Sequence, residues 1–213
     1  MGRGSQTAAG TWDRLAARYG KQERWERAAI DAALRVAAPR ADERLVDLGT
    51  GTGLLLRTLA ARYDSRPREA VGIDHSPRML AAVGTLPPGW SVRQADASAV
   101  PLPDGWADVV TCAYVLHVLT APQRGALLAE ARRLLAPGAT SRLVVVTVWS
   151  DRAAARAALR LLARGLGDAG VGLRPLEPSA ELERAGFAPA RRVRLPQHGY
   201  PSLVLLAKLV APS

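Results

Sequence analysis

The chain contains little cysteine and no long apolar run. Its only cysteine is Cys112, so no disulfide can form within the chain, which favours a reducing compartment such as the cytoplasm. The longest apolar runs, near residues 143–149 and 203–211, are far shorter than the ~20 residues that cross a bilayer. The N-terminus lacks the apolar core of a signal peptide. We therefore expect a cytoplasmic protein with no membrane partner.

Lysine is also scarce, although the chain is strongly basic. Only Lys21 and Lys208 are lysines, so arginine supplies nearly all the positive charge behind the net charge of +10. Such a charge raises the possibility of nucleic-acid binding. The arginines are dispersed, however, and the densest pairs, at 132–133 and 191–192, have no interleaved aromatic residues. The sequence therefore does not favour a nucleic-acid partner, while attraction of an anionic substrate stays open.

Metal-binding and hydrolase motifs are missing as well. The three histidines are scattered and show no zinc-ligand spacing with the single cysteine. No Gly-x-Ser-x-Gly nucleophile elbow is present. We expect no metal site.

Short apolar runs alternate with helical patterns from Arg44 onward, which predicts an α/β fold with a doubly wound parallel sheet. Only residues 196–201 separate the last two expected strands, too few for a parallel crossover. We therefore expect a mostly parallel seven-stranded sheet with an antiparallel last strand. The expected strands are 45–48, 70–74, 90–95, 107–113, 143–149, 191–195 and 202–210, and helices are expected at 54–63, 77–83, 122–136, 153–166 and 179–186.

The N-terminal region has a different pattern. Residues 1–10 are small, polar and unpatterned, which predicts a flexible tail. Residues 11–38 show helical periodicity that stops at Pro39. A length of 213 residues fits one α/β domain. We expect a single domain over residues 11–213, in which the helices of residues 11–40 form a lid on a core of residues 41–213.

The segment LVDLGTGTGLLL, residues 45–56, places a glycine-rich turn between a strand and a helix. Glycine lets a ligand approach the backbone, and a helix N-terminus offers unpaired N–H groups. The dinucleotide fingerprint G-x-G-x-x-G fails, because its third glycine would fall on Leu54 or Leu56. A phosphate-binding P-loop fails because the segment has no lysine. What remains is an acid followed by alternate glycines: Asp47, Gly49, Gly51 and Gly53.

Together with five later blocks, this segment resembles the class I S-adenosylmethionine-dependent methyltransferases, in particular the small-molecule branch that includes ubiquinone and menaquinone C-methyltransferases. The resemblance runs from about residue 42 to residue 209 and implies the Rossmann-like methyltransferase fold with S-adenosylmethionine as cofactor. The family's Pro-Gly-Gly before the fifth strand is Pro137-Gly138-Ala139 here. The blocks, in order, are VDLGTGTG (46–53), GIDHSPRML (72–80), QADASAVPLPDGWADVV (94–110), YVLHVL (114–119), EARRLLAPGA (130–139) and ERAGF (183–187).

The resemblance also implies cofactor contacts. Asp47 would position the cationic methionine end, although it could instead only organise the turn. Asp74 would accept hydrogen bonds from both ribose hydroxyls, as an acid does in dinucleotide sites, and Asp96 would accept from the adenine amine. The Ala97 N–H would meet an adenine nitrogen, and the Ala113 carbonyl would accept from the cofactor ammonium. The remaining expected cofactor residues are Gly49, Thr50, Gly51, Gly53, His75 and Met79, of which Met79 could equally be core.

Catalytic and substrate residues are less well defined. His117 follows the fourth strand and His198 the sixth, so either could reach an acceptor proton as a general base. His117 could instead pack against the backbone, and His198 could face solvent. Alignment of acceptor and methyl group could also suffice without a base. The candidate aromatic walls of a substrate pocket, each of which could be core, are Trp12, Tyr19, Tyr114, Trp149 and Tyr200.

These observations predict an enzyme that transfers a methyl group from S-adenosylmethionine to O, N or C of a small organic acceptor. One alternative is an RNA or protein methyltransferase, which only the net charge of +10 supports. Another is a protein or subunit that binds S-adenosylmethionine without methyl transfer, because cofactor motifs report binding and not turnover. The oligomeric state, monomer or homodimer, stays open.

Overall fold

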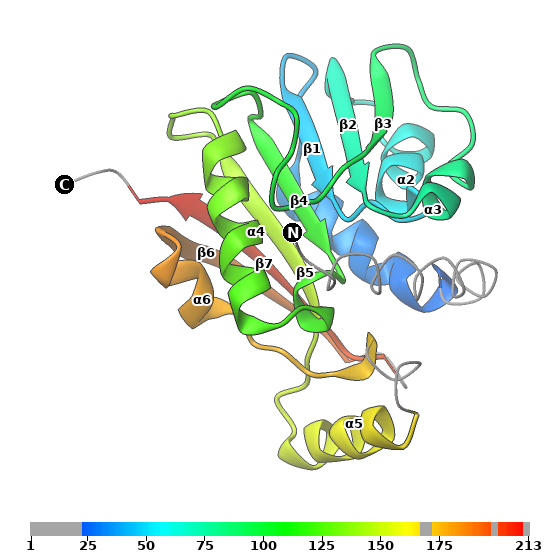
Figure 1. Cartoon of the computed structure of the whole chain (residues 1–213), viewed down its shortest axis with the longest axis vertical. Coiled ribbons are helices and arrows are strands. Elements are labelled where there is room, and N and C mark those ends of the chain that lie inside the picture. The colour runs from blue at the N-terminus through cyan, green and yellow to red at the C-terminus, as the bar shows by residue number, and fades with distance from the viewer. Residues whose placement is uncertain (1–22, 167–171, 197–199, 211–213) are drawn as a thin grey trace, which may run out of the picture.

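The computed structural model contains one seven-stranded sheet with the order β3-β2-β1-β4-β5-β7-β6 (Figure 1). The structure describes residues 23–166, 172–196 and 200–210. β7 pairs antiparallel with both β5 and β6, whereas β1 to β5 pair in parallel, so the predicted mostly parallel sheet is confirmed. The strands are β1 Arg44–Leu48, β2 Glu69–Asp74, β3 Trp90–Gln94, β4 Val109–Ala113, β5 Arg142–Val148, β6 Phe187–Leu195 and β7 Ser202–Leu209.

The helices largely follow the predicted pattern. Residues 23–37 are helical within the expected N-terminal helical region. Ser76 caps α3 by accepting a hydrogen bond from the Met79 N–H, and Pro77 is the first residue of the helix. Ser179 is the first residue of α6, and Pro178 occupies the N-cap position. The others are α2 Leu54–Arg62, α3 Pro77–Ala81, the 3₁₀ turn η1 Leu116–Val118, α4 Ala121–Leu134, α5 Ala153–Gly165 and α6 Ser179–Arg184.

Helices cover both faces of the sheet and bury two apolar clusters. The helix at residues 23–37, α2 and Leu159 of α5 pack on one face, and α4 and α6 pack on the other. All seven residues of β5 are buried, as expected for a strand covered on both sides. The arrowheads of β1, β2 and β4 point toward the side of the molecule where α5 lies (Figure 1). Loops after these strands therefore gather on that side.

β6 begins four residues earlier than the sequence indicates, at Phe187 instead of Arg191. This extension was not predicted because it contains Pro189, and proline has no N–H to donate to a neighbouring strand. β6 is the outermost strand of the sheet, and its register shifts between Pro189 and Arg191. An edge strand with a bulge tolerates proline.

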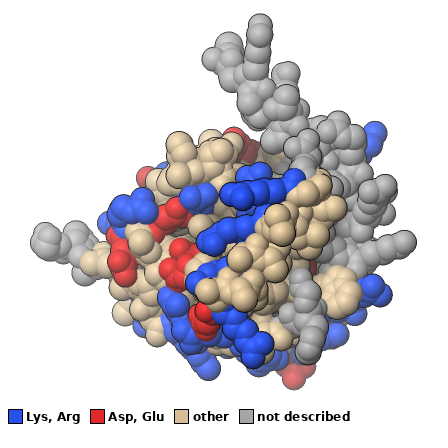
Figure 2. All heavy atoms as spheres, turned by 90° about the horizontal axis from the view of Figure 1, so that it is seen from below, with Lys and Arg blue, Asp and Glu red and all other residues tan. Residues whose placement is uncertain are grey.

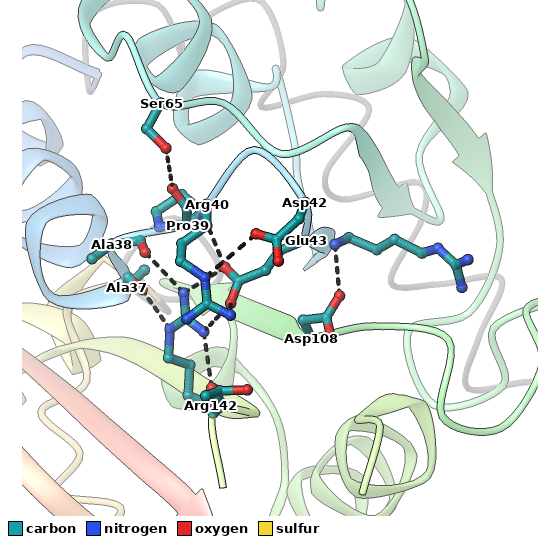
Figure 3. Close-up of polar contacts among 11 residues, drawn as sticks. Ala37, Ala38, Pro39, Arg40, Asp42, Glu43, Ser65, Asp108 and Arg142 are labelled. Atoms are coloured by element: carbon teal, nitrogen blue, oxygen red, sulfur yellow. Dashed lines mark hydrogen bonds and ion pairs between the residues drawn. The ribbon is translucent and has the colours of Figure 1, made fainter. Parts of the chain in front are cut away.

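A buried ion pair joins the N-terminal helix to the sheet (Figure 3). The Arg142 guanidinium, at the start of β5, donates to both carboxylate oxygens of Glu43 at 2.9 and 2.8 Å. It also donates to the carbonyl oxygens of Ala37 and Ala38, where the helix at residues 23–37 ends. Arg142 and Glu43 are 8% and 2% exposed, so the two charges satisfy each other in a largely dry site.

The pKa of Glu43 reflects this pairing. Burial alone would raise the pKa of the carboxyl, but hydrogen bonds from the Arg142 side chain and the Arg40 N–H outweigh burial and lower it. A carboxyl whose pKa is lower in the folded protein than in the unfolded chain stabilises the fold at pH values above its unfolded-state pKa. This stabilisation is lost as the pH falls through the folded-state pKa. The ion pair therefore holds the N-terminal helix most firmly near neutral pH.

We predict that Arg142→Met destabilises the protein by about 3–5 kcal/mol at pH 7, because it leaves a buried carboxylate without its cation. The double variant Arg142→Met/Glu43→Leu should recover most of that loss, since no buried charge remains. Urea unfolding at pH 7 and pH 4 measures both effects, and the single variant should lose less at pH 4, where Glu43 can take up a proton. A double variant no more stable than the single one would contradict this account.

Candidate cofactor site

The glycine loop lies between β1 and α2, beside β4, where the strand order reverses. In open α/β sheets ligands bind at this switch point, outside the carboxyl ends of the strands. Gly49, Gly51 and Gly53 have φ values of +71°, +54° and +73°, which other residues adopt only with strain. The N–H groups of Gly49 and Thr50 donate to the Ile73 carbonyl at 2.8 and 2.9 Å. The loop is thus fastened to β2.

The three glycines differ in what surrounds them. A Cβ on Gly49 would overlap the Val115 side chain, and one on Gly53 would come within 2.8 Å of Val83. A Cβ on Gly51 would meet nothing within 4 Å. Gly49 and Gly53 are therefore needed for packing, whereas Gly51 borders open space in which a ligand can approach the backbone.

Asp74 ends β2 beside this open space. Its Oδ2 accepts from the Gly51 N–H at 2.9 Å and its Oδ1 from the Ser76 N–H at 2.9 Å. The carboxylate is 8% exposed, and each oxygen has a second lone pair. The two amides fix the orientation of Asp74 and leave it able to accept from a pair of ligand hydroxyls.

Asp47 lies deeper, at 2% exposure, and its Oδ1 accepts a hydrogen bond from the Thr111 hydroxyl at 2.7 Å. Burial raises the pKa of Asp47 to about 6, and the Asp74 carboxylate adds to the rise while the Thr111 hydroxyl opposes it. A nearby cation would stabilise the ionised form of an acid that is buried in this way. Sequence reasoning missed Thr111, because a single threonine in the buried run VVTCA carries no signal of its own.

The remaining predicted cofactor residues occupy the same edge of the sheet or the core below it. Asp96 is exposed after β3, and its Oδ1 accepts from the N–H and hydroxyl of Ser98 at 2.8 and 2.7 Å. His75 Nδ1 lies 3.6 Å from Asp74 Oδ1. Met79 is 2% exposed and packs as a core residue. Ala97 follows Asp96, Ala113 ends β4, and Thr50 is buried in the loop.

These residues fit S-adenosylmethionine, whose two cationic groups require acids and whose ribose requires a hydroxyl acceptor. The decisive observation is the open space at Gly51 next to the fixed carboxylate of Asp74. In addition, the buried His75 Nε2 has no hydrogen-bond partner within the part of the chain that the structure describes. Buried polar atoms are normally paired, so this atom is available to a ligand.

The N-terminal helix reaches the loop directly. Glu23 Oε1 accepts from the Thr52 hydroxyl at 2.8 Å and from the Arg57 guanidinium at 2.6 Å. No motif in the sequence includes Glu23, so it could not be predicted as a site residue. Because Thr52 belongs to the glycine loop and Arg57 to α2, the start of the described helix at residues 23–37 is tied to the candidate site.

An aromatic group forms after β4. The Tyr114 ring lies 5.3 Å from the Tyr200 ring and 6.0 Å from the His117 ring. The Tyr114 hydroxyl shares a hydrogen bond with the Ser202 hydroxyl at 2.7 Å, and the Tyr200 hydroxyl donates to the Gly172 carbonyl. The structure thus brings together three residues that the sequence proposed separately for substrate binding or catalysis.

His117 is 4% exposed in η1, and burial lowers its pKa to about 4. The imidazole is therefore neutral at physiological pH and a weak proton acceptor. Trp149 lies after β5 under the Arg156 guanidinium, 4.7 Å from it. Trp12, Tyr19 and His198 lie outside the described residues. Cys112 is fully buried, and burial raises the pKa of its thiol, so the thiol is unreactive.

Comparison with known proteins shows what this part of the chain resembles. Residues 45–138 match a family model described as a methyltransferase domain. Demethylmenaquinone methyltransferase of Thermus thermophilus is 40% identical over 60% of this chain and 56% of its own. Trans-aconitate 2-methyltransferase of Methylobacterium nodulans is 40% identical over 60% of this chain and 46% of its own.

A solved structure extends the similarity over the whole fold. The 1,6-didemethyltoxoflavin-N1-methyltransferase of Burkholderia thailandensis, which holds S-adenosylhomocysteine, superposes with a TM-score of 0.67 at 17% identity, covering 99% of this chain and 91% of its own. The matches confirm the predicted resemblance to S-adenosylmethionine-dependent methyltransferases. The chain spans about half the length of the two curated relatives.

No helix among the described residues is long and apolar enough to span a membrane. Within the same residues, no three His, Cys, Asp or Glu side chains lie together as a metal site would require.

We predict that Gly51→Ala weakens S-adenosylmethionine binding at least about tenfold, because the methyl group fills the space that the ligand needs. The fold should lose only about 1 kcal/mol from the positive φ. Gly84→Ala is the matched control, since Gly84 also has a positive φ of +75° and open space around it. Calorimetry and thermal unfolding separate the two effects. Equal loss of affinity in both variants would remove Gly51 from the site.

We predict that Asp47→Asn stabilises the unliganded protein by about 2–3 kcal/mol at pH 8 and very little at pH 4. The unfolded carboxyl ionises near pH 3.8 and the folded one near pH 6, so the stability contributed by Asp47 falls as the pH rises through that window. The same variant should bind S-adenosylmethionine more weakly. Asp64→Asn, at an exposed acid, is the control for unfolding. A gain that is the same at both pH values would contradict the burial of an ionised Asp47.

Proposed function

We propose that this protein transfers the methyl group of S-adenosylmethionine to a small organic acceptor. The observation that carries the proposal is the pair of acids at the glycine loop, Asp47 and Asp74, beside the open space at Gly51. A buried acid with a raised pKa and a carboxylate oriented by two amides form a site for a ligand that is both cationic and rich in hydroxyls.

Each residue then has a defined task. Asp74 would hold the ribose hydroxyls through the free lone pairs of its two oxygens. Asp47 would be drawn to its ionised form by the cationic end of the cofactor. Asp96, with the Ala97 N–H, would receive the adenine. S-adenosylmethionine supplies a methyl group already activated by its sulfonium, so the protein's main contribution is alignment of the acceptor.

The aromatic group at Tyr114, His117 and Tyr200 is our proposed boundary of the acceptor pocket. His117 would act by contact, because its neutral, buried imidazole is a poor proton acceptor. A general base is then needed only if the acceptor must lose a proton. The earlier candidates Trp12, Tyr19 and Trp149 stay predictions for the same pocket, and His198 stays a prediction as a base.

We also propose that residues 11–40 act as a lid on a core of residues 41–213. The hydrogen bonds of Glu23 with Thr52 and Arg57 support this division, since they join the helix at residues 23–37 to the cofactor loop. A cytoplasmic location, favoured by the single cysteine, and a monomer or homodimer belong to the same proposal.

The acceptor class is argued from the relatives. The acceptors given by their names are a demethylmenaquinone, trans-aconitate and a toxoflavin precursor, which differ in chemistry but are all small molecules. The shared part is the cofactor half of the site. We therefore propose a small organic acceptor and leave its acceptor atom to experiment.

We predict that methyl-labelled S-adenosylmethionine transfers label to a pool of quinols, carboxylic acids or amines, and not to total RNA or bulk protein. Asp74→Ala should raise the KM for S-adenosylmethionine about 10–150-fold, because two charge-assisted hydrogen bonds are lost. Asp64→Ala, at an exposed acid away from the loop, is the control. Label in RNA alone would favour the macromolecular alternative, and the absence of any thermal shift with S-adenosylmethionine would overturn the proposal.

A further inference from the structure

α5 contacts the rest of the molecule through a narrow strip. It follows the carboxyl end of β5, and only Leu159 and Ala163 of the helix are buried. Leu161 is 71% exposed, Leu162 is 51% exposed, and Leu166, just after the helix, is 48% exposed. In Figure 1 the helix lies below the sheet, apart from the other helices. Its apolar surface is therefore wider than the surface that the protein itself covers.

The charged residues of α5 lie on one flank. Arg156, Arg160 and Arg164 are spaced four residues apart and so line one side of the helix. Arg156 is held against the Trp149 ring and donates to the carbonyl oxygens of residues 150 and 151. Arg160 and Arg164 are exposed, and neither takes part in an ion pair within the described part of the chain.

The outward face of α5 is mainly apolar. At 100° per residue, Leu161 lies opposite the buried strip, and Leu162 lies between the strip and the outward face. Ala154, Ala157 and Gly165 lie within about 40° of Leu161, whereas Ala158 lies about 60° to one side of it and Arg164 about 60° to the other. The helix has no Asp or Glu at all. An arginine flank beside an apolar face, on a helix that the protein covers only in part, is the pattern of a helix that lies in a membrane interface.

Figure 2 views the molecule from the side on which α5 lies. Lys and Arg side chains form a band across the middle of this face, with Asp and Glu side chains along one edge of the band and an uncharged area along the other. The carboxyl ends of β1, β2 and β4 point toward the same side (Figure 1). The basic face and the candidate cofactor site thus share one side of the molecule.

Other occupants of this surface fit less well. A second copy would bring a second arginine flank to the interface, and α5 has no acid to neutralise either one. A nucleic acid would use the arginines, but exposed leucines add nothing to phosphate binding. An anionic lipid surface uses both features, because headgroups attract the guanidinium groups while the acyl boundary takes up the leucines.

We propose that α5 docks the protein on membranes that contain anionic lipid. Arg160 and Arg164 supply attraction to the headgroups, and Leu161, Leu162 and Leu166 insert at the boundary of the acyl layer. The expectation of no membrane partner rested on the lack of a spanning segment, and a helix that lies on the surface needs none.

Docking on a membrane deepens the proposed function. The biological role of this docking rests on that proposed function. It would turn the side that carries the cofactor loop toward the lipid, so the favoured acceptors are apolar molecules dissolved in the membrane. Vesicle binding does not require methyl transfer, so failure of docking and failure of the methyltransferase proposal are distinguishable.

The test is sedimentation of the full chain with vesicles of phosphatidylcholine, with and without phosphatidylglycerol. We expect at least about fivefold more binding to the anionic vesicles at low salt, and a decrease when salt is raised. Arg160→Glu/Arg164→Glu should lower binding at least about tenfold. Leu161→Gln/Leu162→Gln, which keeps the net charge, should do the same. Equal binding to neutral and anionic vesicles would overturn the proposal.

The control is Arg93→Glu/Arg184→Glu, which makes the same change in net charge at exposed arginines of β3 and α6. It should bind anionic vesicles within about twofold of the original protein. A cooperative thermal unfolding transition, measured without ligand, checks that every variant is folded. The proposal is wrong if the control loses as much binding as the α5 variants, or if the leucine variant keeps full binding. It is also wrong if the leucine variant turns a dimer into a monomer, because a second copy would then cover α5.

Discussion

Close packing of the glycine loop against its neighbours is the constraint on which the candidate site depends. The loop is bonded to the Ile73 carbonyl of β2, and Gly72 leaves room for Thr50, which a Cβ would approach to 2.8 Å. Gly53 leaves similar room for Val83. Only because these positions lack side chains can the Gly51 N–H reach Asp74 and fix its carboxylate. The chemistry of the site follows from backbone packing.

The two ends of the sheet use buried acids in opposite ways. At the amino end Glu43 is paired with Arg142, so its pKa is lowered in spite of burial and its charge supports the fold. At the carboxyl end the described residues give Asp47 a hydroxyl from Thr111, and its pKa is raised. The first acid is satisfied within the protein, whereas the second carries a cost that a cationic ligand can offset. The opposite pKa shifts of these two buried carboxyls distinguish a binding site from a structural ion pair.

The sequence predicted those features that depend on local pattern. The alternation of apolar runs and helices gave the sheet, and the short link between the last two strands gave the reversed β7. The candidate cofactor residues could be predicted because their blocks are contiguous in the chain. Contacts between distant residues, such as Arg142 with Glu43 or Glu23 with Thr52, left no such pattern. The start of β6 was missed because its proline is tolerated only at the edge of a sheet, which the sequence does not reveal.

The arginines show how dispersion along the chain differs from dispersion in space. Their scatter in the sequence argued against a basic binding surface. That argument applies to a groove that binds a single strand of nucleic acid. A helix, however, gathers residues four apart on one side, so Arg156, Arg160 and Arg164 line one flank without forming a charged run. Leu159 and Ala163 hold that helix to the core, while Leu161 faces outward and Leu162, between these two directions, is 51% exposed. Net charge alone could not distinguish nucleic acid from lipid as the partner; the leucines beside the arginines favour lipid.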